Sequence, residues 1–161
     1  MKILGIDPGS RAAGYGIVDF SGGRLNFVCC GVIRVNTKQP FSARLLEIHQ
    51  GISEVIDKHQ PDLAAIEEVF MAKNPNSALK LGHARGVLIL AAMQQKLSPA
   101  EYTPRQIKQA VAGYGNADKA QIQHMVKAIL SLAKSPSHDA ADALAVAICH
   151  ANHLQASHKL G

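Results

Sequence analysis

Residues 2–10 have the sequence KILGIDPGS, in which an apolar run ends at one acidic residue and turn-forming residues follow at once. A short apolar run bounded by Pro and Gly predicts a buried β-strand that ends at Asp7. The carboxylate of Asp7 would then lie at the edge of a sheet, where the chain leaves the core. An acid in this position is expected in an active site rather than on the general surface.

Three more acidic residues lie at similar boundaries. Glu67 ends the apolar run of residues 63–66, and Asp139 and Asp142 are three residues apart in the segment DAADALAVAI. On a helix these two acids share one face, and the remainder of that helix is almost entirely apolar. Such a helix is buried, so its acids need compensation, and a divalent cation that prefers oxygen ligands supplies it. The four acids therefore predict metal-dependent phosphodiester chemistry, with Mg²⁺ or Mn²⁺ as the ion.

Three blocks of the sequence resemble the RuvC family of Holliday-junction resolvases. The blocks are GIDPGSRAAGYGIV at 5–18, AIEEVFMAKNPNSALKLGHARGV at 65–87 and HDAADALAVAICH at 138–150, in the order and spacing of the family. The resemblance extends over essentially the whole chain. It implies an α/β fold with a ribonuclease-H-like mixed five-stranded sheet flanked by helices, and a homodimer. It also implies Mg²⁺-dependent nicking of two opposed strands of a four-way DNA junction during recombination and repair.

The family's functional residues fall on the four acids already singled out. The resemblance implies that Asp7, Glu67, Asp139 and Asp142 are the catalytic metal ligands, with two Mg²⁺ per subunit and Asp7 as the bridging ligand. Taken without the resemblance, Asp7 could cap a turn, Glu67 could be a surface residue, and the other two acids could favour a helix N-terminus. The family also implies RuvA and RuvB, the branch-migration proteins, as partners.

Basic and aromatic residues near the acids are candidates for DNA contact. An aromatic residue flanked by bases, such as Phe70, is suited to stacking on an unpaired nucleobase while its neighbours bind phosphates. Lys108 and Lys119 match family lysines that hold the scissile strand. A core phenylalanine and solvated basic faces are the alternatives. The DNA-binding candidates are Phe70, Lys73, Asn74, Lys80, Arg85, Arg105, Lys108 and Lys119.

Small residues follow one side of a predicted helix at intervals of four. They are Ala78, Gly82 and Gly86. Because a glycine costs about 1 kcal/mol of helix stability relative to alanine, a close packing contact is expected here. The contact could be with the sheet beneath the helix or with a second copy of the same helix. A junction has two symmetry-related scissile strands, so we predict a two-fold dimer with this helix at its interface.

The composition agrees with a DNA-binding protein of one domain, which we expect to comprise residues 1–161. The chain has 161 residues and carries 17 Lys and Arg against 12 Asp and Glu, a net charge of +5. With several acids committed to a metal site, the remaining surface is more basic still, which favours a polyanionic partner. Three cysteines, two of them adjacent, imply no disulfide framework. Without a secretory signal or a segment of ~18 apolar residues, we expect a cytoplasmic protein and no membrane partner.

The hydrophobic periodicity predicts strands that open the chain and then alternate with helices, which gives a mixed sheet covered by helices. The predicted strands are 2–7, 15–20, 25–35, 62–69 and 102–103. The predicted helices are 41–59, 74–95, 104–112, 118–133 and 137–153.

Two other classes of protein share part of this pattern. The segment GIDPGS resembles the first phosphate loop of the actin-like ATPases, but these need two such domains and a second Gly-rich loop, which this chain lacks. A ribonuclease-H-like nuclease with an RNA-containing substrate would keep all four acids and remains an alternative, whereas a non-catalytic junction-binding module would not need them. A zinc site at Cys149, His150 and His153 is disfavoured, because adjacent helical residues point apart and no distant cysteine pair completes a tetrahedron. Ala13 stands where many family members have a hydroxyl residue, which puts the geometry around Asp7 in question.

Overall fold

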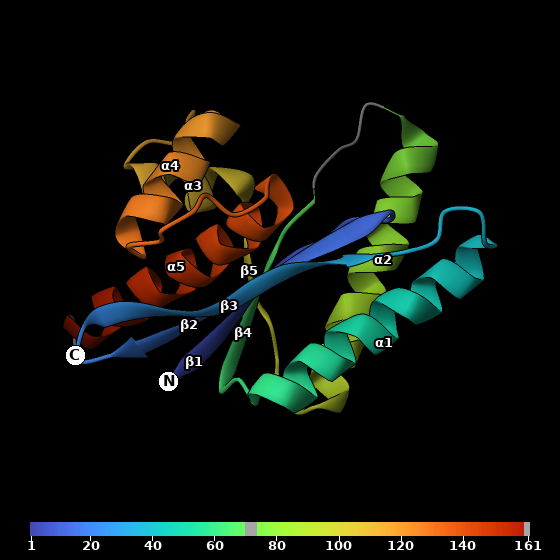
Figure 1. Cartoon of the computed structure of the whole chain (residues 1–161), viewed down its shortest axis with the longest axis horizontal. Coiled ribbons are helices and arrows are strands. Elements are labelled where there is room, and N and C mark those ends of the chain that lie inside the picture. The colour runs from blue at the N-terminus through green and yellow to red at the C-terminus, as the bar shows by residue number, and fades with distance from the viewer. Residues whose placement is uncertain (70–73, 160–161) are drawn as a thin grey trace.

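The computed structural model describes residues 1–69 and 74–159 (Figure 1). The strands in this part of the chain are β1 (Lys2–Asp7), β2 (Ala12–Ser21), β3 (Arg24–Arg34), β4 (Leu63–Glu67) and β5 (Ala100–Tyr102). The helices are α1 (Phe41–His59), α2 (Pro75–Gln94), α3 (Pro104–Ala112), α4 (Lys119–Ile129) and α5 (His138–Lys159). Among the described residues, no helix has both the length and the apolar character that a membrane crossing requires.

The described strands form one mixed sheet of five strands in the order β3-β2-β1-β4-β5. β1 is its central strand, antiparallel to β2 and parallel to β4. β2 and β3 form a hairpin whose turn residues Gly22 and Gly23 have φ of 56° and 76°, a conformation that glycine adopts without strain. The predicted mixed sheet is confirmed.

Helices cover both faces of the sheet. α3, α4 and α5 lie on one face, and α1 and α2 lie side by side on the other (Figure 1). Side chains alternate between the two layers, as the period of a strand requires: Ile3 and Ala65 pack toward α5, whereas Leu4 and Ile66 pack toward α1 and α2. The same alternation places residues 5, 7 and 67 on the α5 face.

Glycines in the first two strands allow α5 to approach the sheet closely. A Cβ atom on Gly5 would lie 2.1 Å from the carbonyl oxygen of Ala143, and one on Gly14 would lie 2.1 Å from that of Asp139. Gly16 pairs with Gly5 across the β1–β2 ladder and is closed off in the same way by Leu144. Because this contact is so tight, α5 is fixed against β1 and β2, and its first turn lies beside the end of β1.

Some boundaries differ from the sequence prediction. α4 ends at Ile129, four residues before the predicted end, because Ser131 adopts a left-handed conformation with φ of 51°. α5 continues to Lys159, since no Gly or Pro follows before residue 161. β2 begins three residues earlier than predicted, because its ladder with β3 extends to the pair Ala12–Arg34.

Candidate active site

The four predicted acids meet at one end of the sheet. Asp7 and Glu67 end two neighbouring parallel strands and point to the same face. Asp139 and Asp142 lie in the first two turns of α5, which packs against that face. One carboxylate oxygen from each of Asp7, Asp139 and Asp142 lies within 4.8 Å of the other two. Three carboxylates from two elements far apart in the sequence therefore form a compact cluster.

Glu67 joins this cluster through Asp7. The pairing of Ile6 with Ile66 in the β1–β4 ladder brings the following residues, Asp7 and Glu67, next to each other. Their carboxyl groups lie close enough to share a proton, and this proximity raises the pKa of Asp7. A proton between two carboxylates is the usual result when like charges approach closely with no cation between them.

The electrostatics of the cluster oppose full ionisation. Burial raises the pKa of Asp7 to about 9, with further contributions from the negative charges of Glu67, Asp142 and Asp139. Burial, together with Glu67, raises the pKa of Asp142 to about 6. The pKa of Glu67 is also raised by burial, against the opposing effect of Lys108 and Lys119. A cation bound among these carboxylates would stabilise their ionised forms.

The cluster lies in a pocket with two lysines at its rim. The pocket has a volume of ≈ 540 Å³ and contains Lys108 of α3 and Lys119 of α4. Each lysine is close enough to lower the pKa of Glu67, and Lys119 also lowers that of Asp142. A larger cavity, ≈ 720 Å³, lies between β3 and the segment after α4, but no acidic residue lines it. We therefore assign the chemistry to the smaller pocket.

The donor set fits a hard divalent cation. The cluster offers carboxylate oxygens from strand and helix positions that are fixed by packing, and they open onto the pocket of ≈ 540 Å³. Asp118 also lines the pocket, but its side chain accepts a hydrogen bond of 2.8 Å from the Gln121 amide and caps α4. Cys149, His150 and His153 form no comparable group in the described part of the chain, and the His150 ring instead contacts the Tyr102 hydroxyl at 2.7 Å.

Two of the predicted DNA-binding residues on α2 have contacts within the fold. Asn74 caps α2, its side-chain oxygen accepting from the Asn76 amide at 2.9 Å. Arg85 donates to the carbonyl oxygen of Glu67 at 3.0 Å and forms an ion pair with Glu101, so it holds the end of β4. The predictions for Phe70 and Lys73 fall outside the described residues.

The remaining predicted residues lie at the surface. Arg105 is exposed at the start of α3 and packs along Gly115, and Lys80 is exposed on α2. A Cβ atom on Gly82 or Gly86 would meet no atom of the described residues within 4 Å. These two glycines face away from the sheet, so the first of the two explanations for the small-residue stripe, packing on the sheet, is wrong.

Two features of the first strands bear on the site. Ala13, which put the geometry around Asp7 in question, is fully buried against α1 and α2 on the face opposite the Asp7 carboxylate, so its side chain does not line the site. The packing role of Gly5, Gly14 and Gly16 was missed. Its signal was present in the sequence as glycines at alternate positions of two adjacent strands, all on the face that carries Asp7.

The order of strands, the helices on both faces and the acids at the ends of β1 and β4 and in the first turns of α5 define a ribonuclease-H-like protein with a cluster of acids suited to a cation. The family described as crossover junction endodeoxyribonuclease RuvC matches residues 3–150. The chain belongs to the RuvC family.

Known relatives are similar over nearly their whole length. The RuvC of Hahella chejuensis is 52% identical over 161 residues, covering 100% of this chain and 93% of the relative, and that of Tolumonas auensis is 56% identical over 150 residues, covering 93% and 86%. The structure of T. thermophilus RuvC in complex with a Holliday junction substrate has a TM-score of 0.90 at 35% identity, covering 98% of this chain and 96% of that one. A yeast mitochondrial Holliday junction resolvase, 14% identical with a TM-score of 0.71, shares the fold over 97% of this chain and 80% of its own.

Proposed function

We propose that this protein is a Holliday-junction resolvase, a metal-dependent endonuclease that nicks two opposed strands of a four-way DNA junction. The observation that carries the proposal is the cluster of Asp7, Glu67, Asp139 and Asp142 in a chain of the RuvC family. A relative 35% identical to this chain has been solved with a Holliday junction substrate. The RuvA and RuvB proteins are proposed as partners on the strength of the family alone.

The acids are proposed to bind two Mg²⁺ ions per subunit, with Mn²⁺ as an effective substitute. Divalent ions in such a site supply Lewis-acid stabilisation of the attacking and leaving oxygens of a phosphodiester. The protein's part is to hold the carboxylates: Asp7 from the central strand, Glu67 beside it, and Asp139 and Asp142 from a helix that the strand glycines fix in place. Asp7, which lies beside Glu67 and near both acids of α5, would be the ligand shared by the two ions.

Lys108 and Lys119 are proposed to bind the phosphates of the scissile strand. Both line the pocket of the acids and approach it from α3 and α4, on the side opposite the sheet. Ammonium groups there attract the strand toward the site and offset the repulsion between the carboxylates and a phosphodiester. Arg105, exposed one turn before Lys108, extends this basic edge, and Phe70 is proposed to stack on an opened base.

A dimer formed through α2 is proposed from an exposed apolar stripe. The stripe includes three exposed apolar side chains, Leu79, Leu90 and Met93, with exposed fractions of 63%, 53% and 50%. Together with His83 and Gly86, these residues follow one another at steps of four and three along one side of the helix. This is the spacing of helices that pack on each other along their length, and Gly82 and Gly86 allow close approach. Leu46 on α1, 56% exposed, adds apolar surface on the neighbouring helix.

One assay compares the proposed function with its alternative, a nuclease for RNA-containing substrates. The purified protein is incubated with Mg²⁺ and end-labelled four-way junction, plain duplex, or RNA-containing duplex, with EDTA as the control. Symmetric nicks in the junction, absent from the duplexes and from the EDTA sample, are expected. Preferential cleavage of the RNA strand would reject the resolvase in favour of the alternative.

A further inference from the structure

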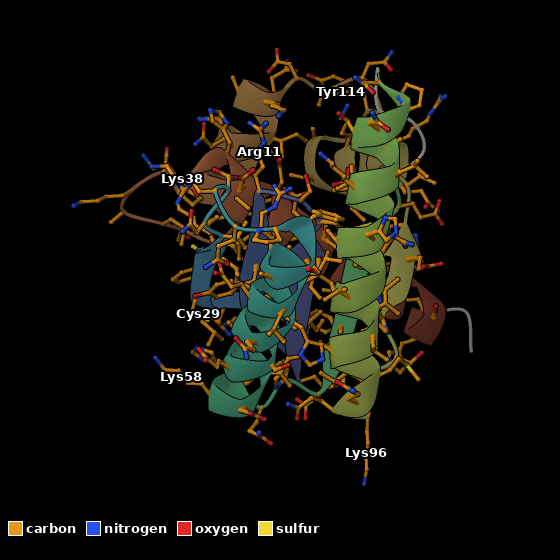
Figure 2. All side chains as sticks on the ribbon, turned by 90° about the vertical axis from the view of Figure 1, so that its right-hand side faces the viewer. Arg11, Cys29, Lys38, Lys58, Lys96 and Tyr114 are labelled. Atoms are coloured by element: carbon orange, nitrogen blue, oxygen red, sulfur yellow. The ribbon has the colours of Figure 1, made fainter. Side chains whose placement is uncertain are left out.

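A second polar pocket lies at the end of the molecule where α1 and α2 begin. Its volume is ≈ 430 Å³, and it is lined by Ser10, Arg11, Thr37, Arg44, Ser77 and Lys80. These residues come from the loop after β1, the loop before α1, and the first turns of α1 and α2. Figure 2 shows Arg11 at this end of the two helices. Every lining side chain can donate a hydrogen bond, three carry positive charge, and none is acidic.

None of the three cations of this pocket forms an ion pair in the described part of the chain. The ion pairs there join the N-terminus to Asp19 and Arg85 to Glu101, so Arg11, Arg44 and Lys80 form none. The first turns of α1 and α2 contain no acidic residue. The Nε atom of Arg44 is buried and has no hydrogen-bond partner among the described residues. A buried donor without a partner is costly, and an anion in the pocket would satisfy it.

An aromatic ring holds two of the cations in position. The guanidinium carbon of Arg44 lies 4.9 Å from the centre of the Phe41 ring, and the Lys80 Nζ atom lies 6.0 Å from it. His83 packs edge-on to the same ring, with 5.8 Å between ring centres. Cation–π contact restricts both long side chains, so less of their freedom is lost when an anion binds.

We propose that this pocket binds a backbone phosphate of the DNA, at a position separate from the carboxylate site. The inference rests on the proposed function for its source of phosphate. Two arginines, one lysine and three hydroxyl groups around a small cavity suit a phosphate, whose oxygens accept hydrogen bonds in several directions. Neither Arg11 nor Arg44 is among the DNA-binding residues proposed above, and Lys80 acquires a defined site.

The position of the pocket indicates which phosphate it binds. Arg11 follows Asp7 by four residues, so their Cα atoms are at most about 14 Å apart at 3.3–3.6 Å per residue. At the 3.4 Å that each nucleotide of one strand adds along the axis of a DNA helix, this is a separation of at most about four nucleotides. The strand would pass over the end of β1, with one phosphate at the acids on the α5 face and another, a few nucleotides away, in this pocket. Two such anchors would fix the register in which the strand is cut.

The first test uses inorganic phosphate and requires no DNA. The Nε–H signal of Arg44 is followed by NMR while phosphate is added to the wild-type protein in EDTA at constant ionic strength. A saturable shift is expected, and Arg11→Gln and Lys80→Gln should each weaken phosphate binding severalfold. Lys58→Gln and Lys96→Gln remove the same charge at the far ends of α1 and α2 (Figure 2). These two control variants should bind phosphate as tightly as the wild type. A non-saturating shift, or an equal loss in all four variants, would overturn the pocket.

The second test asks whether DNA occupies the same pocket. Junction binding is measured in EDTA over a range of salt concentrations for the same four variants. Arg11→Gln and Lys80→Gln should each reduce the slope of log K against log salt by about 0.9, and the two control variants should keep it. Unchanged slopes in the pocket variants would overturn the DNA assignment. Junction DNA should also reverse the phosphate-induced shift of Arg44.

The two proposals fail in different ways. A wild-type protein that binds phosphate at Arg44 but cuts no junction would refute the proposed function and leave the anion pocket in place. If the wild-type protein resolves junctions and the pocket variants bind and cut them equally well, the pocket is refuted as a DNA contact and the proposed function stands.

Discussion

Gly5 of β1 packs directly on the backbone of Ala143 in α5, so that a Cβ atom at this glycine would lie 2.1 Å from the carbonyl oxygen of Ala143. The contact connects the two elements that supply the site: Asp7 is two residues after Gly5 on the same face, and Asp142 immediately precedes Ala143. The distance between the strand acid and the helix acids therefore depends on the absence of a side chain at position 5.

Gly5→Ala should weaken both the fold and the proposed activity. The added methyl group must push α5 away from β1, which typically costs about 1–3 kcal/mol of stability and separates Asp142 from Asp7. A displacement of the order of 1 Å can reduce catalysis about 10²-fold. Denaturant unfolding measures the first effect, and junction nicking well below the melting temperature measures the second.

The matched control for this variant is Ile48→Ala. Ile48 is fully buried on the opposite face of the sheet, and its truncation costs about 2–5 kcal/mol without touching α5. A folded Ile48→Ala protein should cut junctions at close to the wild-type rate. If Gly5→Ala loses no more activity than this control, the close contact with α5 does not position the acids.

Without a divalent ion, stability should fall as the pH rises. The pKa of Asp7 is about 9 in the folded protein and near 3.8 when unfolded, and that of Asp142 is about 6 against 3.8. Between these values the folded state keeps a proton that the unfolded state releases. The contribution of both acids to stability is therefore complete below about pH 4 and is lost as the pH approaches 6 and then 9.

Melting temperatures in EDTA and in Mg²⁺ across pH 5 to 9 test this expectation. Mg²⁺ should stabilise the protein more at high pH than at low pH. A ligand present at one hundred times its Kd raises the free energy of unfolding by about 2.7 kcal/mol. Asp7→Asn should flatten the EDTA profile and raise stability near pH 8, since the amide is neutral without taking up the proton that the buried Asp7 carboxyl group must keep in the folded state. A variant as pH-sensitive as the wild type would show that Asp7 is not the group that titrates.

Asp7→Asn should abolish nicking while junction binding survives. The amide keeps the shape of the side chain but removes the charge that holds a cation, and the basic residues that bind phosphate are untouched. Binding in EDTA and cleavage in Mg²⁺ are measured on one preparation. Asp19→Asn, at a partly exposed aspartate on β2 that pairs with the N-terminus, is the control and should cut normally. Parallel loss of binding and cleavage in Asp7→Asn would indicate a structural role instead.

Lys108→Ala and Lys119→Ala should act through phosphate contacts and leave the fold intact. Both side chains reach the acid pocket from the surface, so little packing is lost. Each variant should reduce the salt slope of junction binding by about 0.9 or slow the nicking step. Lys127→Ala, in the last turn of α4, removes the same charge outside the pocket and should do neither. A wild-type slope together with wild-type cleavage would remove these lysines from the site.

The fold and the acids were predictable because short-range patterns determine them. Apolar runs that end at Asp7 and Glu67 indicate strand ends, and the spacing of Asp139 and Asp142 indicates a common helix face. Two features could not be predicted in this way. Whether Gly82 faces the sheet or solvent depends on the rotation of α2 about its axis, and its mixed pattern of small and apolar residues does not fix that rotation. The pocket of Arg11, Arg44 and Lys80 joins three separate segments, so no local pattern reveals it.

The orientation of Gly82 allows a direct test of the proposed dimer. Because its missing side chain faces open space in the described structure, Gly82→Leu should keep the monomer folded and even favour the helix by about 1 kcal/mol. In a dimer that packs through this side of α2, the leucine would separate the two helices. Light scattering should then report monomers, and nicks in a junction held in a supercoiled plasmid should be single rather than paired. His124→Leu, an equally apolar change on the exposed side of α4, controls for surface hydrophobicity and should leave a dimer that makes paired cuts. A Gly82→Leu protein that remains dimeric and resolves the junction would place the interface on another surface.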